Sequence, residues 1–427
     1  MHPLDVNKYF FFLFIFSLLF VIVLYSLIGF QYIDEICVLL LFVLFFLTIL
    51  NTPQWEFNKV FLISLGVFLF YAIYSLIIGS NSPRAIFNDF VINLKPYLGF
   101  FCVYQLKVYF DESKKKLLKE ISLLIWFVFL LPVGLISIFD DNVIVLTLTH
   151  PANLAIVTII VSLCYLYSSN FTKRDKTIFL VILSIGIISG KSKFYGFFTL
   201  SIFLIFFLNI IRQLKMNLKS IFVMCSMLTI IIIVAWQKIS LYFFDALINI
   251  GDKKGDMIAR FVLYRTFPEI LRDYFPFGSG FASYATHSSG EYYSGLYAKY
   301  GIENVYGISK HFCNFISDTY YPSLAQFGVV GIILFILFWA YIIKKAIRLY
   351  KRSGYTLSKH LVLVLMIIGF IAIECTTGSA FIAQGGFFVM MMIGMILSDM
   401  QKACFDYEST KYRVPDFGGN QDATNLN

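Results

Sequence analysis

Residues 9–30 read YFFFLFIFSLLFVIVLYSLIGF, an apolar run without a single charged side chain. A helix needs about 20 mostly apolar residues to cross a bilayer, and this run meets that requirement. Its length, and the absence of an A-x-A-like site after it, predict a retained membrane helix rather than a cleavable signal peptide. The fold class then depends on how often such runs recur.

Similar runs recur along the whole 427-residue chain, and together they predict about 12 membrane-spanning helices. They lie near residues 9–30, 36–50, 60–79, 86–106, 117–139, 149–169, 176–190, 194–211, 220–241, 320–343, 360–379 and 381–398. The composition agrees, because 59% of the residues are hydrophobic and only 14% are charged, against about 25% charged in soluble domains. The chain is therefore predicted to be an all-α polytopic membrane protein. Nucleic-acid binding, cytosolic redox chemistry and a disulfide scaffold are excluded.

The basic residues predict the topology. Most of them fall in alternate loops and in both tails, which places the N- and C-termini in the cytoplasm by the positive-inside rule. The net charge of +9 is thus mostly a topology signal and gives no support for a nucleic-acid partner. Residues 1–245 then hold the first nine spans, 246–319 form one large extracytoplasmic loop, and 320–398 hold the last three spans. The polar tail 399–427 is expected to be disordered.

A minority of the basic residues break this rule, because they lie on the outer side or inside a span. They are Arg84, Lys95, Lys191, Lys193, Lys238, Lys253, Lys254, Arg260, Arg265, Arg272, Lys299 and Lys310. Basic residues in such places are costly, which favours a function. Lys191 and Lys193 share a tight outer turn and predict an anion site, the alternative being a lysine pair that snorkels to the headgroups. Arg84 lies at another outer turn.

Within the large loop, residues 258–275 (IARFVLYRTFPEILRDYF) have the periodicity of an amphipathic helix. Its apolar stripe consists of Leu263, Phe267, Ile270, Leu271 and Tyr274. Arg260 lies on that stripe, where a buried anion is the expected partner. Arg265 and Arg272 lie on the opposite face, where a solvated, ion-paired surface is the simpler interpretation.

The sequence after this helix offers backbone and side-chain groups for chemistry. Gly278-Ser279-Gly280 allows close approach of the backbone and predicts N–H groups open to an anion, although it is neither a Rossmann fingerprint nor a P-loop. The outer groups that could act as a base are Asp318, His287, His311, Glu291, Glu303, Glu374, Asp140, Asp141, Asp34 and Glu35. The two loop histidines lie among tyrosines, a composition that suits stacking on sugar rings. No metal-binding spacing is present, so we expect neither a metal nor a nucleotide cofactor.

In four places the chain resembles the superfamily of O-antigen polymerases (Wzy-type) and O-antigen ligases. The matching segments are His150-Pro151-Ala152-Asn153-Leu154-Ala155, Ser189-Gly190-Lys191-Ser192-Lys193, Arg260 through Gly278-Ser279-Gly280, and Asp318-Thr319-Tyr320 followed by Leu324, Gly328 and Gly331. The resemblance covers roughly residues 145–335. Lys193 stands where the family usually has an arginine, so the bidentate fork for phosphate is lost. Asp318 stands where ligases usually carry a histidine.

The resemblance implies an inverting glycosyltransferase. It would polymerise undecaprenyl-diphosphate-linked repeat units at the outer face of a bacterial cytoplasmic (inner) membrane, with a chain-length regulator as a membrane partner. Arg260, Lys191 and Lys193 would bind the diphosphate, and Asp318 or His311 would be the base. Further contacts with the diphosphate or glycan would come from Arg84, Arg265, Gly278, Gly280, Tyr320 and His287. The product could be O-antigen, capsule or another exopolysaccharide.

Three alternatives stay open on the sequence. A ligase of the same superfamily would share these motifs. A glycosyltransferase that uses polyprenyl-monophosphate sugars would explain Asp34 and Glu35 in the first outer loop, but such enzymes commonly end in a soluble domain. A flippase or secondary carrier would suit the number of spans, but the two halves of the chain lack symmetric Gly/Pro breaks.

Overall fold

The computed structural model describes residues 5–29, 32–52, 55–140, 142–212 and 255–412. These residues are helical or form turns and loops, and they contain no β-strand beyond an isolated bridge between Ser309 and Phe312. Seven of the described helices are long and apolar enough to cross a membrane. The chain is therefore an α-helical polytopic membrane protein, as its sequence predicts. The predicted span 220–241 and the start of the large loop, with Lys238, Lys253 and Lys254, lie outside the described residues.

The first half of the described chain follows the apolar runs closely. Its elements are α1 (Val6–Phe16), the π-helical segment η1 (Ser17–Val23), α2 (Tyr25–Ile28), α3 (Ile33–Leu50), α4 (Lys59–Ile78), α5 (Pro83–Gln105), α6 (Glu112–Ile125), the π-helical turn η2 (Trp126–Leu130), α7 (Leu131–Ser137), α8 (Asn142–Leu148), α9 (Pro151–Ser168), α10 (Lys173–Ser184), the 3-10 turn η3 (Ile185–Ser189) and α11 (Ser192–Arg212). Side-chain caps start several of them; for example, Asn58 accepts from the N–H of Val60 at 2.9 Å before α4.

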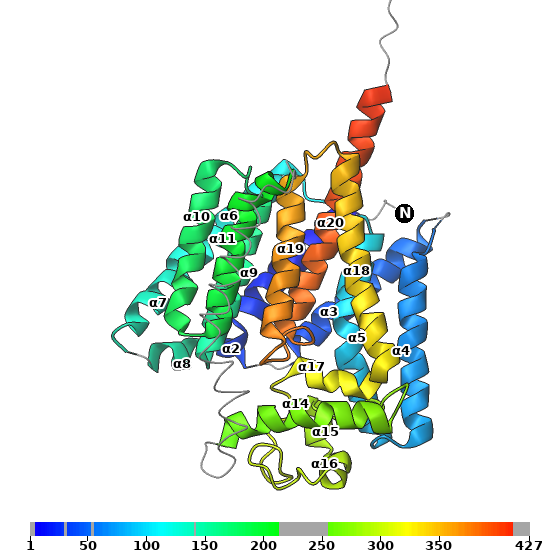
Figure 1. The fold of residues 1–427 in the computed structure, drawn as a ribbon. Helices are drawn as coiled ribbons and strands as arrows, with labels where there is room; N and C mark the ends of the chain where they lie inside the picture. Colours follow the sequence, from blue (N-terminus) through cyan, green and yellow to red (C-terminus); the bar gives the residue numbers. More distant parts are fainter. Residues whose placement is uncertain (1–4, 30–31, 53–54, 141, 213–254, 413–427) are drawn as a thin grey trace, which may run out of the picture.

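The second half contains the loop helices and the last long helices. They are α14 (Gly255–Asp273), α15 (His287–Glu291), α16 (Leu296–Lys299), α17 (Tyr320–Ser323), the 3-10 turn η5 (Leu324–Phe327), α18 (Gly328–Arg352), α19 (Ser358–Glu374) and α20 (Gln384–Tyr412). In Figure 1 the long helices form a bundle, and α14, α15 and α16 pack beneath one end of it. We call this the loop end. α1 begins and α20 finishes at the opposite end.

The expectation of disorder immediately after residue 398 is wrong, because α20 continues to Tyr412. Two contacts explain the extension. Cys404 is buried and its thiol lies 3.1 Å from the carbonyl oxygen of Leu349, and Arg352 makes a bidentate ion pair with Glu408 at 2.9 and 3.0 Å. Both contacts attach the end of α20 to α18.

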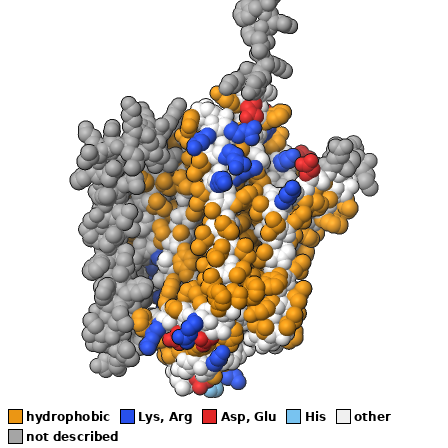
Figure 2. Space-filling model, turned by 45° about the vertical axis from the view of Figure 1, so that its right-hand side comes forward, with side chains coloured by type: hydrophobic (Ala, Val, Ile, Leu, Met, Phe, Trp, Pro, Cys, Tyr) orange, Lys and Arg blue, Asp and Glu red, His pale blue; other side chains and the backbone are white. Residues whose placement is uncertain are grey.

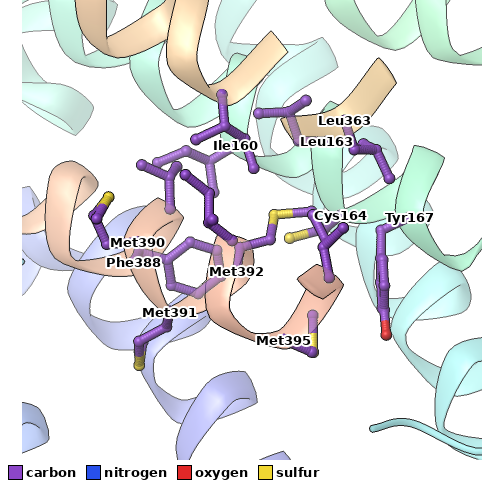
Figure 3. Close-up of a cluster of buried hydrophobic side chains, with 14 of the residues drawn as sticks. Ile160, Leu163, Cys164, Tyr167, Leu363, Phe388, Met390, Met391, Met392 and Met395 are labelled. Carbon is purple, nitrogen blue, oxygen red and sulfur yellow. The ribbon is translucent and has the colours of Figure 1, made fainter. Parts of the chain in front are cut away.

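The densest packing lies around α9 and α20. In an 18-residue apolar stretch of each of these two helices, 78% of the residues are buried. The corresponding share is 17% for α4 and 28% for α17 to α18. Figure 3 shows the centre of this core, where Ile160, Leu163 and Cys164 of α9 lie near Met392 of α20 and Leu363 of α19. Flexible methionine side chains fill irregular gaps of this kind. α9 and α20 therefore form the interior of the bundle, whereas α4 and α18 lie at its periphery.

The face of the molecule drawn in Figure 2 is divided as a bilayer requires. Figure 2 shows a broad hydrophobic band between a group of lysines and arginines near one end and a smaller mixed group of charges near the other. The last turns of α18 contribute Lys351 and Arg352 to the basic end. A peripheral apolar band with charges confined to its two edges is the surface that a lipid-embedded helix bundle presents.

Candidate functional site

The segment Gly278–Gly280 lies against the start of α18. Gly278 and Gly280 have φ values of +83° and +82°, and a Cβ on Gly278 would lie 2.2 Å from the backbone nitrogen of Gly328. The N–H of Gly280 donates to the carbonyl of Gln326 at 2.8 Å, and that of Gly278 donates to the carbonyl of Tyr274, directly after α14, at 2.7 Å. The expectation that these N–H groups are open to an anion is therefore wrong. The close approach that the glycines permit is to another stretch of backbone.

The residues that follow attach the loop to the membrane helices. The buried carboxylate of Asp89 in α5 accepts from the N–H of Ala282 at 2.7 Å, and Ser75 of α4 accepts from the N–H of Phe281 at 2.7 Å. Buried N–H groups need such acceptors. These contacts hold the end of α14 in a fixed position relative to α4, α5 and α18.

Two residues predicted to act together, Arg260 and Asp318, form an ion pair at the loop end. Arg260 lies near the start of α14 and Asp318 immediately before α17. The guanidinium Nη2 is 2.6 Å from Oδ2 of the carboxylate, and the two side chains are 23% and 31% exposed. The pair is thus partly desolvated yet reachable, which lets an external anion compete for the arginine.

Lys193 pairs with a carboxylate that the sequence indicated only weakly. Its Nζ lies 2.6 Å from Oε2 of Glu374, the last residue of α19, and 3.4 Å from the carbonyl oxygen of Thr377. The side chain of Glu374 is only 5% exposed. An acidic residue at the end of an otherwise apolar span is the signal that could have identified it.

His150 lies close to both ion pairs. Partial desolvation lowers the pKa of this histidine, Lys191 and Lys193 lower it further, and Arg260 acts in the same direction against the opposing charge of Asp318. Charges influence a pKa in this way only at short range. We therefore define the loop-end charge cluster as His150, Lys191, Lys193, Arg260, Asp318 and Glu374.

The connection between α19 and α20 binds this cluster together. The hydroxyl of Tyr264 in α14 donates to the carbonyl of Thr376 at 2.8 Å, and the N–H of Tyr320 donates to the carbonyl of Cys375 at 3.3 Å. The hydroxyl of Ser379 donates to the carbonyl of Ser317. The cluster thus occupies the place where the ends of several membrane helices meet the loop helix α14. The part of the chain that the structure describes holds no group of three His, Cys, Asp or Glu side chains that could share a metal ion.

The remaining predicted site residues lie around the cluster. Arg265 is exposed on the outer face of α14, His311 is exposed in the loop before α17, and Arg84 lies 5.9 Å from the ring centre of Tyr292. Tyr320, by contrast, is buried at 3% exposure. The structure therefore brings together Lys191, Lys193, Arg260 and Asp318. The other four predicted residues, Arg265, His311, Arg84 and Tyr320, are not members of the cluster.

His287 lines a pocket whose walls combine polar side chains with Cys313 and Ile316. The pocket has a volume of about 330 Å³ and is also lined by Thr286, Glu291, Asn314 and Ser317. His287 itself is exposed and lies 3.6 Å from Glu291. Ser317 in the pocket wall directly precedes Asp318 in the chain.

A second group of charges lies inside the bundle. Lys95 of α5 forms ion pairs with Asp34 and with Glu35, the latter at 3.1 Å, and both Lys95 and Asp34 are buried. Asp34 and Glu35 were expected in a short outer loop, but α3 begins at Ile33, so they belong to its first turn. One lysine therefore balances two carboxylates within the helix bundle.

Replacing Lys95 by methionine is expected to destabilise the protein by about 3–5 kcal/mol, because it leaves two carboxylates without their buried cation. The thermal unfolding of the purified protein in detergent would measure the loss. Lys95→Met combined with Asp34→Asn is expected to recover part of the stability, and Lys344→Met, at an exposed site in α18, to change little. Equal unfolding temperatures for Lys95→Met and Lys344→Met would contradict the role of the buried lysine.

No protein-family model matches the chain, and a search of curated proteins finds no similar sequence. The fold and the loop-end charge cluster together define a class, an α-helical polytopic membrane protein with a charged site at one end of its bundle. Its function is inferred from the chemistry of that site and from the motifs around it.

Proposed function

We propose that the protein is an inverting glycosyltransferase that polymerises undecaprenyl-diphosphate-linked oligosaccharide repeat units. It would have about 12 spans with both termini in the cytoplasm, and its loop end would face the outside of the bacterial cytoplasmic membrane. The observation that carries this proposal is the loop-end charge cluster, in which Lys193 and Arg260 are paired with two carboxylates and the charge of Lys191 acts on the neighbouring His150. The product would be O-antigen, capsule or a related polysaccharide.

The cations suit a lipid diphosphate as the leaving group. Such a group carries about two to three negative charges, and preorganised cations stabilise charge that develops as a bond breaks. In the structure Arg260 and Lys193 are paired with Asp318 and Glu374. An incoming diphosphate would compete for both cations and leave Asp318 free of its guanidinium partner. Binding of the donor would thereby prepare the base.

The bond changes of the proposed reaction can be assigned to these groups. A sugar hydroxyl of the acceptor attacks the anomeric carbon from the side opposite the diphosphate, so that the new glycosidic bond forms with inversion. The bond between that carbon and the phosphate oxygen breaks, and undecaprenyl diphosphate leaves with the electron pair. Asp318 accepts the proton from the attacking hydroxyl. Its contact with Arg260 favours Asp318 over the exposed His311 as that base.

The pocket lined by His287 and Ser317 offers polar groups to a sugar. Its histidine, glutamate and asparagine side chains supply donors and acceptors for hydroxyl groups, and its volume is about 330 Å³. The rings of Tyr293 and Tyr297, tilted by 43° to each other, lie near its helix α15 with ring centres 5.3 Å apart. A glycan held in this pocket would contact Ser317, the residue directly before Asp318.

The glycan profile of a null strain, with and without the wild-type gene, tests the proposed function. On a denaturing gel we expect a ladder of repeat units with the gene and single repeat units without it. Polymer retained on undecaprenyl diphosphate in the null strain would instead indicate a ligase. Single units trapped on the inner leaflet would indicate a flippase. An identical ladder in both strains would refute all three activities.

A further inference from the structure

An apolar groove runs along the periphery of the bundle between α4, α5 and α18. Its volume is about 310 Å³, and its walls include Val67 and Phe68 of α4, Tyr97 of α5, and Leu334 and Phe338 of α18. Hydroxyl and amide groups are a small part of this lining. The groove therefore suits a hydrocarbon far better than a sugar or a phosphate.

The groove lies where lipid is the surrounding solvent. α4 and α17 to α18 are among the helices long and apolar enough to span a membrane, and most of their residues face outward rather than into the bundle. The face shown in Figure 2 carries the broad hydrophobic band between the two charged edges. A chain that fills the groove would therefore come from the bilayer.

Tyr320 links the wall of the groove to the loop-end charge cluster along the chain. Tyr320, which lines the groove, lies two residues after Asp318, and its N–H donates to the carbonyl of Cys375 beside Glu374. The groove is also lined by Tyr341, whose hydroxyl accepts from Nδ2 of Asn58 at 3.1 Å. At about 1.5 Å per helical residue, the stretch of α18 from Gly331 to Tyr341 extends about 15 Å along the membrane.

We propose that this groove holds the part of the polyprenyl diphosphate carrier's hydrocarbon chain that lies nearest the diphosphate, while the diphosphate lies on the loop-end charge cluster. The proposal rests on the proposed function. A polyprenyl carrier has a single chain, which suits one narrow groove, whereas a phospholipid has two. Its anionic headgroup complements Arg260 and Lys193, and Tyr320 in the groove wall lies two residues after Asp318, the ion-pair partner of Arg260. The groove would thus fix the depth and direction from which the leaving group enters the site.

Photo-crosslinking tests the occupant on the full-length protein in nanodiscs of phosphatidylethanolamine and phosphatidylglycerol. The probe is undecaprenyl diphosphate with a diazirine on an isoprene unit near its diphosphate. We expect labelled peptides from residues 60–71 of α4 and 331–341 of α18. Excess unlabelled undecaprenyl diphosphate should remove the label, and excess phosphatidylglycerol should not. Label confined to other helices, or equal competition by phosphatidylglycerol, overturns the proposal.

A pair of neighbouring substitutions provides a matched control. Leu334 lines the groove, whereas Ile333 is 51% exposed and is not among the lining residues. Leu334→Trp is expected to weaken binding of the probe about tenfold, equivalent to about 1.4 kcal/mol, and Ile333→Trp to leave it unchanged. Equal binding by the two variants overturns the groove as the binding site. In that case a normal ladder from the wild type would still support the proposed function. A wild-type protein that binds no probe and makes no ladder would refute both the groove as the binding site and the proposed function.

Discussion

Replacing Arg260 by alanine is expected to abolish the polysaccharide ladder and to leave single repeat units. The substitution removes the guanidinium that would stabilise the departing diphosphate, and loss of one such group typically costs about 10²–10³-fold in rate. It also leaves Asp318, now 2.6 Å from the guanidinium, without that partner. The rate of polymer formation in isolated membranes supplied with lipid-linked repeat units would measure the effect, alongside the glycan profile of the complemented strain.

Two further variants show whether the effect is specific. Arg272 lies on the same helix, is exposed, and pairs with the adjacent Asp273 at 3.1 Å. Arg272→Ala is therefore expected to retain the full ladder. Arg260→Lys keeps the charge but loses the bidentate fork, so we expect an intermediate rate. A normal ladder from Arg260→Ala at normal expression would show that the guanidinium does not serve the reaction.

The helices were predictable where the hydropathy or periodicity of their own residues determines them. The apolar runs marked most of the long helices within a few residues, although α18 continues to Arg352, beyond the predicted end at residue 343. The 3.6-residue periodicity of 258–275 marked α14 (Gly255–Asp273). The end of α20 was not predictable in this way, because its stability comes from contacts with α18. Arg352 and Glu408, for example, are 56 residues apart in the chain. Polar composition alone resembles disorder until such a tertiary partner is known.

The loop-end charge cluster was predictable in its cations but not in its pairing. The positive-inside rule identified Lys191, Lys193 and Arg260 because a basic residue on the outer side violates a physical preference. Nothing local links Arg260 to Asp318, 58 residues away, or Lys193 to Glu374, 181 residues away. Those pairs depend on how the helix ends meet.

The glycines show a different limit of the sequence. A Gly-x-Gly pattern indicates positive φ values and a close approach to the backbone, and both are present at Gly278 and Gly280. The pattern does not say what approaches. Here the backbone around Gly328 occupies the space that a ligand was expected to fill, because the loop must be fixed to the start of α18. Close approach by a ligand and close approach by another stretch of backbone both require a residue without a Cβ, so the pattern alone does not distinguish them.

Replacing Asp318 by asparagine is expected to lower the rate of glycosyl transfer by about 10²–10⁴-fold, the usual contribution of a general base. Asparagine has nearly the same shape but cannot accept the proton of the acceptor hydroxyl. The variant also releases Arg260 from its ion pair, so the affinity for undecaprenyl diphosphate should stay the same or increase. Separate measurement of diphosphate binding and of kcat in isolated membranes would distinguish these two effects.

The same measurements separate a base from a residue that only positions Arg260. If Asp318 served only to hold the guanidinium in place, Asp318→Asn would weaken diphosphate binding together with the rate. Loss of rate with binding retained therefore assigns the proton transfer to Asp318. His311→Ala is the matched test of the other possible base, and it is expected to leave kcat almost unchanged because His311 is exposed in the loop before α17. The reverse result, an inactive His311→Ala and an active Asp318→Asn, would assign proton transfer to the histidine and leave Asp318 as the partner of Arg260.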